Sequence, residues 1–340
     1  MSNNQEFFRE TMQRILRDVM ANTTMGVSTP RVLPSLLFSA LADNGILAML
    51  ATEDAGGIGA SLSETMTILR AAGDAAAPGP LLETILANAL LGEAGRPLAN
   101  GPVTLALLPE GLPQDGAPLV LQLPWAGLVE TVLLVAPLEN GTIVVETSSS
   151  KWQIAAGEDA AGEPNDIISA PTDLMANHFT IDLSFDEILR RTSILRAGQM
   201  LGAMEWTYRR SVEYAMERQQ FGREIGKFQV VQQMLADLAD HVLAATVLLE
   251  AAAENNSLMM AGAARSRLAD ATDCAITVSH QVHGAMGFSV EYALNHRTRR
   301  MMAWRDTYGS VPYWRRAVGT VLARSNRETL WHTLTATAQT

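Results

Sequence analysis

The second half of the chain is dominated by long stretches without helix breakers. Residues 185–220, FDEILRRTSILRAGQMLGAMEWTYRRSVEYAMERQQ, contain no proline and consist mostly of residues that tolerate a helix well. Stretches of the same kind cover 228–256 and 261–284, and a last helix is predicted over about 312–333. Four long helices with short connections are typical of a bundle. We therefore expect residues 184–340 to form a C-terminal four-helix bundle.

The segment before this bundle has a different residue pattern. Between residues 101 and 183 the chain contains short apolar runs separated by Pro, Gly and Asn, namely VTLALLP, APLVLQLP, VETVLLVAPL and GTIVVETS. Such punctuation predicts strands joined by turns. Residues 101–183 are therefore expected to form a small, shortened β domain.

The first hundred residues predict helices with short breaks. Apolar side chains recur at helical spacing near the N-terminus, at Phe8, Met12, Ile15, Leu16 and Val19. The triplet 43–45, Asp-Asn-Gly, predicts the end of a second helix, and Ser61 or Ser63 is expected to cap the next one. The predicted fold is therefore mainly α with a small β domain, in the order N-terminal helical domain (1–100), β domain, bundle.

Composition excludes several classes of protein. The single cysteine, Cys274, excludes a disulfide framework and a cysteine-based zinc site. No apolar run reaches the roughly 18 residues of a membrane span. The N-terminus, MSNNQEFFRE, is polar and acidic, unlike a signal peptide. We expect a cytoplasmic protein.

Charge is divided unevenly along the chain. Residues 1–183 carry 7 basic and 21 acidic side chains, whereas residues 184–340 carry 18 basic and 15 acidic ones, nearly all of the basic ones Arg. Arginine binds phosphate and carboxylate through a planar fork, so the second half suggests an anionic ligand. Solvated helix faces would produce the same excess. A general nucleic-acid-binding protein would need a broader basic surface.

The most informative motif is ERQQFGREIGKFQVVQQMLAD, residues 217–237. Arg218 is expected at the end of a long helix that breaks at Phe221-Gly222, and a new helix opens at Phe228-Gln229. Arg218 could bind a phosphate and Phe221 could pack on a flat ring. Taken by itself, a helix–turn–helix with a solvated arginine is the simpler interpretation.

A second motif, SHQVHGAMGF, covers residues 279–288. Gly284 and Gly287 could let backbone N–H groups approach a ligand, but taken alone a tight turn between helices is the simpler interpretation. His280 and His283 are close to metal-ligand spacing, but no further ligand stands at a suitable distance, so no metal site is expected.

Two further segments are given structural interpretations. The glycine-rich GGIGAS, residues 56–61, lacks the preceding strand of a dinucleotide fingerprint and is interpreted as a turn between helices. The basic run RTRRMMAWRD, residues 297–306, is interpreted as a solvated helix face.

Taken together, the segments LADNGILAMLATEDAGGIGASLSETMTILRAAG, RQQFGREIGKFQVVQQMLAD and QVHGAMGFSVEYALNHRTRR resemble the acyl-CoA dehydrogenase family over nearly the whole chain. The resemblance implies a flavoprotein that uses FAD to oxidise an acyl-CoA thioester to the 2,3-enoyl-CoA, a carboxylate removing the α-proton. It also implies that the FAD adenine and pyrophosphate reach the bundle of a neighbouring chain, and that an electron-transfer flavoprotein takes the electrons. The matching cofactor positions are Arg218, Gln220, Phe221, Phe228, Gln229, Gln281, Val282, Gly284 and Ala285, the last standing where a second glycine is usual.

Two features of the family have no counterpart here. The segment F-x-x-T-E-x-x-x-G-S-D, which holds the flavin ring and substrate in the family, is absent between 101 and 183. The two positions where the family carries its catalytic carboxylate are occupied by Tyr308 and Thr192, and neither side chain can act as a carboxylate base. Asp306, two residues from the first position, is a weak substitute, because a displacement of several Å is costly in catalysis.

The pattern resembles the short subunit of heteromeric acyl-CoA dehydrogenases that act on steroid side-chain CoA thioesters. The leading hypothesis is that this chain supplies the nucleotide-binding half of a flavin site in a hetero-oligomer such as a heterotetramer. A full-length partner chain would then supply the flavin ring and the base. Two alternatives remain: a homo-oligomeric dehydrogenase with an unusual base, for which Asp306 is the candidate, and a non-catalytic scaffold relative.

Overall fold

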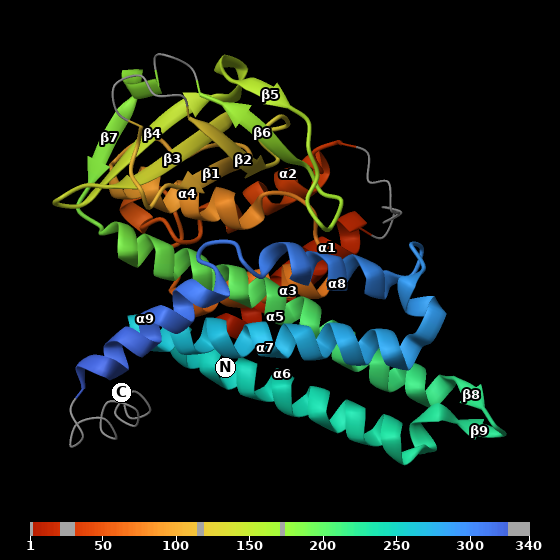
Figure 1. Cartoon of the computed structure of the whole chain (residues 1–340). Coiled ribbons are helices and arrows are strands. Elements are labelled where there is room, and N and C mark those ends of the chain that lie inside the picture. The colour runs from red at the N-terminus through yellow and green to blue at the C-terminus, as the bar shows by residue number, and fades with distance from the viewer. Residues whose placement is uncertain (1–2, 21–30, 114–118, 171–173, 326–340) are drawn as a thin grey trace. The chain divides into compact units, whose positions relative to one another are not determined.

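The computed structural model describes residues 3–20, 31–113, 119–170 and 174–325 (Figure 1). Within these residues the chain forms two compact units. The first comprises the residues up to Thr65 together with Ala77–Thr192, and the second comprises Met66–Ala76 together with the residues from Ser193 onwards. Two helices, α3 (Leu62–Asp74) and α5 (Phe185–Glu217), pass from the first unit into the second. None of the described helices combines the length and apolar character needed to cross a membrane.

The helices of the first unit follow the predicted pattern. They are α1 (Asn3–Met20), α2 (Ser35–Asp43), α4 (Leu81–Glu93) and the short turns η1 (Ile46–Ala48) and η2 (Glu53–Ala55). The predicted amphipathic helix is confirmed, because Met12, Ile15 and Leu16 of α1 are buried. The predicted stop is confirmed as well: α2 ends at Asp43 and Gly45 adopts φ 72°.

Ser61 is the N-cap residue of α3, which begins at Leu62. Its hydroxyl oxygen accepts a hydrogen bond from the Glu64 amide at 3.2 Å, and the Glu64 carboxylate accepts one from the Ser61 amide at 2.8 Å. This reciprocal pair is a capping box, which satisfies two amides at the helix start. The segment 56–61 before it is a turn, as predicted, with Gly56 and Gly59 in left-handed conformations.

The strands of the first unit form two sheets. One sheet has the order β1-β3-β4-β7 and the other has the order β2-β6-β5. The strands are β1 (Val103–Leu107), β2 (Val120–Pro124), β3 (Thr131–Pro137), β4 (Thr142–Ser148), β5 (Gln153–Ala155), β6 (Asn165–Ser169) and β7 (His178–Ile181). β1 and β3 are parallel, and the other pairs are antiparallel. Strands β1 to β4 confirm the four predicted runs.

Apolar side chains of both sheets form one core. It contains Leu134 and Val145 of the first sheet and Ile168 of the second, all inaccessible to solvent, with Trp152 beside them. On the helical side the hydroxyl of Thr84 on α4 accepts a hydrogen bond from the Val103 amide at 3.0 Å, which ties α4 to β1.

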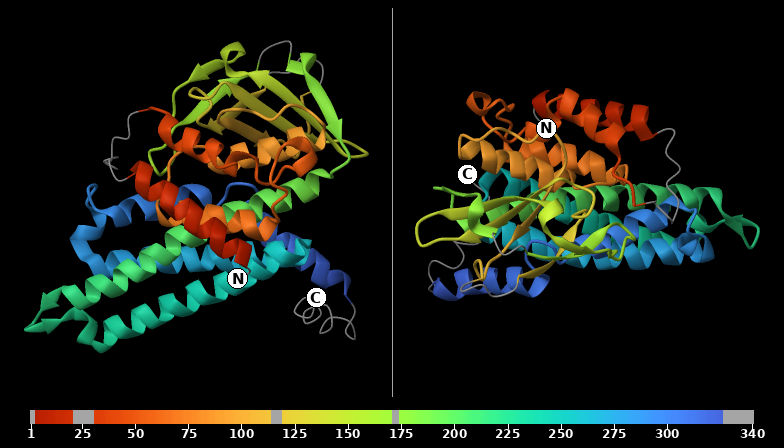
Figure 2. Two further views of the ribbon diagram at one scale, coloured as in Figure 1. Left: turned by 180° about the vertical axis from the view of Figure 1, so that it is seen from behind. Right: turned by 90° about the horizontal axis from the view of Figure 1, so that it is seen from above.

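The second unit is a helical bundle. Besides most of α3 and most of α5, it contains α6 (Gln229–Asn255), α7 (Leu258–His283), η6 (Gly284–Phe288), α8 (Ala293–Trp304) and α9 (Val311–Arg324). α6 and α7 run side by side in opposite directions (Figure 2). The three longest predicted helices are confirmed. The last helix begins at Val311, and the predicted part beyond residue 325 lies outside the described residues.

The interpretation of the basic run 297–306 as a solvated helix face is wrong. The run forms most of α8, but two of its arginines are buried, Arg297 with 8% and Arg300 with 4% of its surface exposed, so this is not a solvated face. The Arg297 guanidinium lies 3.7 Å from the centre of the Trp206 ring and donates a 2.8 Å hydrogen bond to the Asp74 carbonyl at the end of α3. An aromatic face and a helix C-terminus both favour a cation, which allows its burial.

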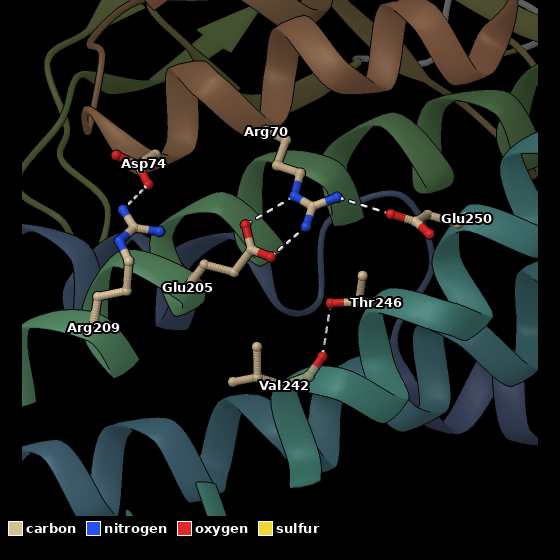
Figure 3. A network of polar contacts seen from close by, with 7 residues as sticks. All are labelled: Arg70, Asp74, Glu205, Arg209, Val242, Thr246 and Glu250. Carbon is tan, nitrogen blue, oxygen red and sulfur yellow. Dashed lines mark hydrogen bonds and ion pairs between the residues drawn. The ribbon is translucent and has the colours of Figure 1, made fainter. Parts of the chain in front are cut away.

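Glycines allow α3 and α5 to cross closely. A β-carbon on Gly73 would collide with the main-chain oxygen of Gln199, and one on Gly202 would collide with that of Arg70. Charged side chains surround this crossing (Figure 3). Arg70 binds both oxygens of the Glu205 carboxylate and reaches Glu250 on α6 at 3.0 Å. The bidentate pair between Arg70 and Glu205 is partly buried and joins α3 to α5 in a defined geometry.

Candidate functional site

The first motif forms a hairpin between α5 and α6. Strands β8 (Gln219–Gln220) and β9 (Arg223–Glu224) pair in antiparallel fashion. The two turn residues, Phe221 and Gly222, have φ of 52° and 79°. Positive φ at both positions is the conformation of a tight hairpin turn, which glycine adopts freely and phenylalanine only at a cost. The predicted break and the start of α6 at Gln229 are both confirmed.

The aromatic side chains of this hairpin lie at the surface. The Phe221 side chain is 93% exposed, and its ring centre lies 6.0 Å from that of Phe228 in an edge-on arrangement. The Arg223 guanidinium lies 4.3 Å from the Phe228 ring centre. Arg218, Gln220 and Gln229 are exposed as well. Within the described part of the chain, Arg218 makes no ion pair.

The second motif forms the end of α7 and the turn η6. Gln281, Gly284 and Ala285 are exposed, whereas Val282 is 7% exposed. Gly284 has φ 60° and ψ −139°, a conformation open only to glycine. Ala285 does not have positive φ, so its methyl group is accommodated without backbone strain. Gly287 is buried and packs inside the turn, which assigns it a packing role.

The bundle brings the two motifs to one end. The Tyr214 ring on the last turns of α5 stacks on the His283 ring at the end of α7, with 4.4 Å between the ring centres. Arg210 donates a 2.9 Å hydrogen bond to the Tyr292 hydroxyl after η6 and pairs with Glu217 at the end of α5. The hydrogen bond from Arg210 also lowers the pKa of the Glu217 carboxyl. Figure 1 shows the hairpin β8–β9 extending beyond this end of α5 and α6.

A groove lies beside the second motif, between α7 and α8. Its volume is about 610 Å³, and Gln281 lines it together with Thr277, Phe288 and Arg299. Its walls also include His280, whose Nε2 lies 3.1 Å from the Thr298 hydroxyl. In the described ranges no cluster of three or more His, Cys, Asp or Glu side chains could hold a metal ion.

The loop between α8 and α9 contains Asp306 and Tyr308. The Asp306 carboxylate accepts a 3.1 Å hydrogen bond from the Val311 amide, the first amide of α9, while Ser310 is the N-cap residue of that helix. Tyr308 has φ 55°. The Arg196 guanidinium lies 5.5 Å from the Tyr308 ring centre and 5.2 Å from that of Trp304.

A buried arginine organises this loop. Arg265 on α7 donates hydrogen bonds to the main-chain oxygens of Arg305, Thr307 and Gly309 at 2.8, 3.0 and 3.4 Å. Burial lowers the pKa of its guanidinium to about 10, and the nearby charge of Arg196 adds to this effect. The sequence offered no signal for Arg265 or Arg196, because an arginine inside a helix does not reveal which way it points.

Thr192, at the other position implied by the resemblance, lies on α5 within the first unit. It is inaccessible to solvent, and its hydroxyl donates a 2.6 Å hydrogen bond to the main-chain oxygen of Ile188 one turn earlier. This bond occupies the only hydrogen of the hydroxyl. Thr192 therefore has a local structural role.

The bundle, residues 185–322, matches the family described as acyl-CoA dehydrogenase, C-terminal domain. The bundle is therefore an acyl-CoA dehydrogenase C-terminal domain, and the chain as a whole is similar to acyl-CoA dehydrogenases. Among its relatives is the acyl-CoA dehydrogenase IpdE2 of Mycobacterium tuberculosis, 28% identical over 257 residues, which cover 74% of this chain and 75% of that protein.

Solved structures of the family share the fold. The ChsE4-ChsE5 complex from Mycobacterium tuberculosis matches with a TM-score of 0.83 at 20% identity, covering 96% of this chain and 99% of that one. The Tcur3481-Tcur3483 steroid ACAD matches with a TM-score of 0.80 at 22% identity, covering 94% of this chain and 97% of that one. The resemblance to the acyl-CoA dehydrogenase family and the predicted fold class are thereby confirmed.

The bundle end offers groups suited to a family cofactor. A flavin dinucleotide presents a pyrophosphate and a flat adenine, which call for a cation, amide donors and an aromatic or apolar surface. Arg218 supplies the cation, and Gln220, Gln229 and Gln281 supply amides. The rings of Phe221 and Phe228 supply aromatic surface. The donor set therefore fits the nucleotide part of FAD.

Proposed function

We propose that this chain is a subunit of an FAD-dependent acyl-CoA dehydrogenase. It binds the adenine and pyrophosphate of FAD through Arg218, Gln220, Phe221, Phe228 and Gln229 and through Gln281, Val282, Gly284 and Ala285. When bound, FAD accepts the hydride removed from the β-carbon of the acyl-CoA thioester. An electron-transfer flavoprotein then takes the electrons. The family match of the bundle supports the reaction class.

One observation supports the proposal that the flavin site is shared between two chains. The polar side chains and the turn aromatic of the nucleotide motifs are exposed on this chain, while both positions for the carboxylate base hold other residues, Tyr308 and Thr192. A complete catalytic centre needs a base within hydrogen-bond reach of the α-proton. The base and the flavin ring site are therefore supplied by a full-length partner chain in a hetero-oligomer.

The proposed substrate is the CoA thioester of a steroid side chain. The Tcur3481-Tcur3483 steroid ACAD, which covers nearly the whole chain at a TM-score of 0.80, supports this class. The ChsE4-ChsE5 complex supports the assignment to a two-component assembly. A branched or aromatic acyl-CoA is the substrate class to compare with it in assays.

A homo-oligomeric dehydrogenase using Asp306 is the second candidate. The position of Asp306 two residues from Tyr308 favours it, but its carboxylate is engaged with the Val311 amide. A scaffold without flavin is the third candidate.

Co-expression with an adjacent full-length dehydrogenase-like chain tests the three candidates. We expect the two chains to form a stable complex that contains flavin, and we expect this chain to be colourless when it is expressed alone. A yellow, active protein without the partner would support the second candidate, and a complex without flavin would support the third.

A single substitution tests the nucleotide site within that complex. Arg218→Ala removes one charge-assisted contact to a phosphate, so we expect flavin affinity to fall by about 2–3 kcal/mol. Arg316→Ala, at an exposed position on α9, is the matched control. Flavin occupancy after dialysis should fall only in Arg218→Ala, and equal occupancy in both variants contradicts the site assignment.

A further inference from the structure

Two histidine rings join the elements at the end of the bundle that carries the nucleotide motifs. The His283 ring on the last turn of α7 lies 4.4 Å from the Tyr214 ring on α5 and 5.4 Å from the Tyr292 ring, measured between ring centres. The His280 ring lies 4.5 Å from the Phe288 ring at the end of η6. The two rings therefore connect α7 to α5 and to η6.

The hydrogen-bond partners determine where each neutral ring carries its proton. Nδ1 of His283 lies 2.8 Å from the Ser279 carbonyl oxygen, which can only accept, so Nδ1 holds the hydrogen. Nε2 of His280 lies 3.1 Å from the Thr298 hydroxyl oxygen. That hydroxyl can donate its own hydrogen to carbonyl oxygens of α8 at 3.2 Å, and Nε2 of His280 is then the donor.

The second nitrogen of each ring is buried without a hydrogen bond. Nδ1 of His280 and Nε2 of His283 meet no hydrogen-bond partner within the described residues. Gly287 closes the space beside them: a β-carbon at Gly287 would lie 3.1 Å from His280 Nδ1 and 3.2 Å from the His283 β-carbon. A proton added at either nitrogen would place a charge on a buried atom that has no acceptor, although the other edge of the His280 ring lines the groove.

We propose that His280 and His283 form an acid-sensitive latch that holds η6 against the bundle. While both rings are neutral, η6 packs over them through Gly287 and Phe288. Once the rings are doubly protonated, the newly protonated nitrogens gain water only if η6 moves away. The geometry thus links the proton uptake of two side chains to the position of one turn.

Several charged and titratable groups face these rings. Arg210 on α5 disfavours a second positive charge on His283, and Glu217 favours it but is already paired with Arg210. A charge on His280 disfavours the protonation of His283. Tyr214 and Tyr292 face His283, and Arg299 of α8 lines the groove beside His280. Apart from the engaged Glu217, these neighbours do not stabilise an imidazolium.

The direction of the pH effect follows from linkage. Burial lowers the pKa of both histidines below the ordinary value of 6.5, and for His283 this outweighs the Ser279 hydrogen bond, which raises it. The open state therefore binds more protons than the closed one. The closed state keeps its full stability above about pH 6.5 and loses it as the pH falls below that value. Each proton taken up changes the opening equilibrium by up to about tenfold per pH unit.

Hydrogen exchange of the isolated chain tests the latch. We expect the protection of amides 284–292, corrected for the intrinsic pH dependence of exchange, to fall at least tenfold between pH 7.5 and 5.0. The double variant His280→Gln and His283→Gln should remove this dependence, since glutamine can donate the same hydrogen bonds without titrating. His283→Phe, which keeps the ring stack, should weaken the dependence, and His178→Gln on the exposed β7 should leave it unchanged.

Two results would overturn the latch: constant protection of these amides in the wild type, or an unchanged pH dependence in the double variant. The consequence for flavin rests on the proposed function and is measured separately. In the assembled complex, flavin affinity should fall below pH 6.5 in the wild type and less so in the double variant. If the complex holds no flavin while the exchange data behave as expected, the proposed function fails and the latch stands.

Discussion

Arg265 donates a 2.8 Å hydrogen bond to the main-chain oxygen of Arg305, and the same guanidinium nitrogen reaches the carbonyl oxygens of Thr307 and Gly309. One buried side chain of α7 therefore sets the path of the whole α8–α9 loop. This loop contains Tyr308, at one of the two positions where the resemblance to the family implies a base. Arg265 binds only main-chain oxygens of the loop. These hydrogen bonds therefore do not involve the side chain at position 308.

Replacing Arg265 is expected to destabilise the bundle. Arg265→Met keeps the aliphatic length but leaves the loop carbonyl oxygens without their donor, so the free energy of unfolding should fall by about 2–4 kcal/mol. Urea denaturation followed by circular dichroism measures this. Arg315→Met, at an exposed ion pair with Asp270, is the control and should cost less than 1 kcal/mol. Equal losses in both variants would contradict the organising role of Arg265.

Asp306→Asn is expected to leave turnover of the assembled complex within about twofold of the wild type. The amide oxygen still accepts the hydrogen bond from the Val311 amide, so the start of α9 is preserved. If Asp306 were the base, losing its carboxylate would reduce kcat by about 10²–10⁴-fold. Steady-state kinetics of wild type and variant separate the two outcomes.

Phe221 is 93% exposed, so its side chain gains almost no burial energy on folding, and its left-handed backbone is unfavourable for a residue other than glycine. Phe221→Asn should therefore raise the free energy of unfolding by about 0.5–1 kcal/mol, because asparagine tolerates positive φ. The same change should weaken flavin binding in the complex. A thermal melt and a flavin titration test the two halves, and unchanged flavin affinity would show that the ring is not kept for binding.

One added methyl group is expected to change the free energy of unfolding in opposite directions at Gly202 and at Gly319. Gly202→Ala forces α3 and α5 apart and should lower the free energy of unfolding by about 3 kcal/mol or more. Gly319→Ala on α9 meets open space in a helix and should raise it by about 0.5–1 kcal/mol. Chemical denaturation of the pair provides the comparison, and a neutral Gly202→Ala would contradict the close crossing.

Local signals predicted much of the architecture. The helix starts and stops at Ser61 and Gly45 and the break at Phe221-Gly222 depend on neighbouring residues, so they could be read from short segments. The same holds for strands β1 to β4, whose apolar runs are continuous. Strands β5, β6 and β7 were not predicted. For β5 the reason is that all three of its residues are exposed, so it exists only through its pairing with β6.

The candidate site divides in the same way. Its cofactor positions were predicted from two motifs about sixty residues apart, without knowledge that they meet. The Tyr214–His283 stack brings them to one end of the bundle, and such a contact depends on helix packing, not on local sequence. The burial of Arg297 was predicted wrongly for the same reason, since the Trp206 ring and the Asp74 carbonyl come from other helices.

The sequence by itself determined the order of helices and strands, the positions of the turns and the absence of a carboxylate at residues 192 and 308. These properties depend on residue type and on neighbours a few positions away. The tertiary structure alone decided which arginines are buried, which side chain organises the α8–α9 loop and how His280 and His283 are partnered. Those properties depend on free energies of burial and on hydrogen bonds between segments far apart in the chain, and these exist only once the helices have packed.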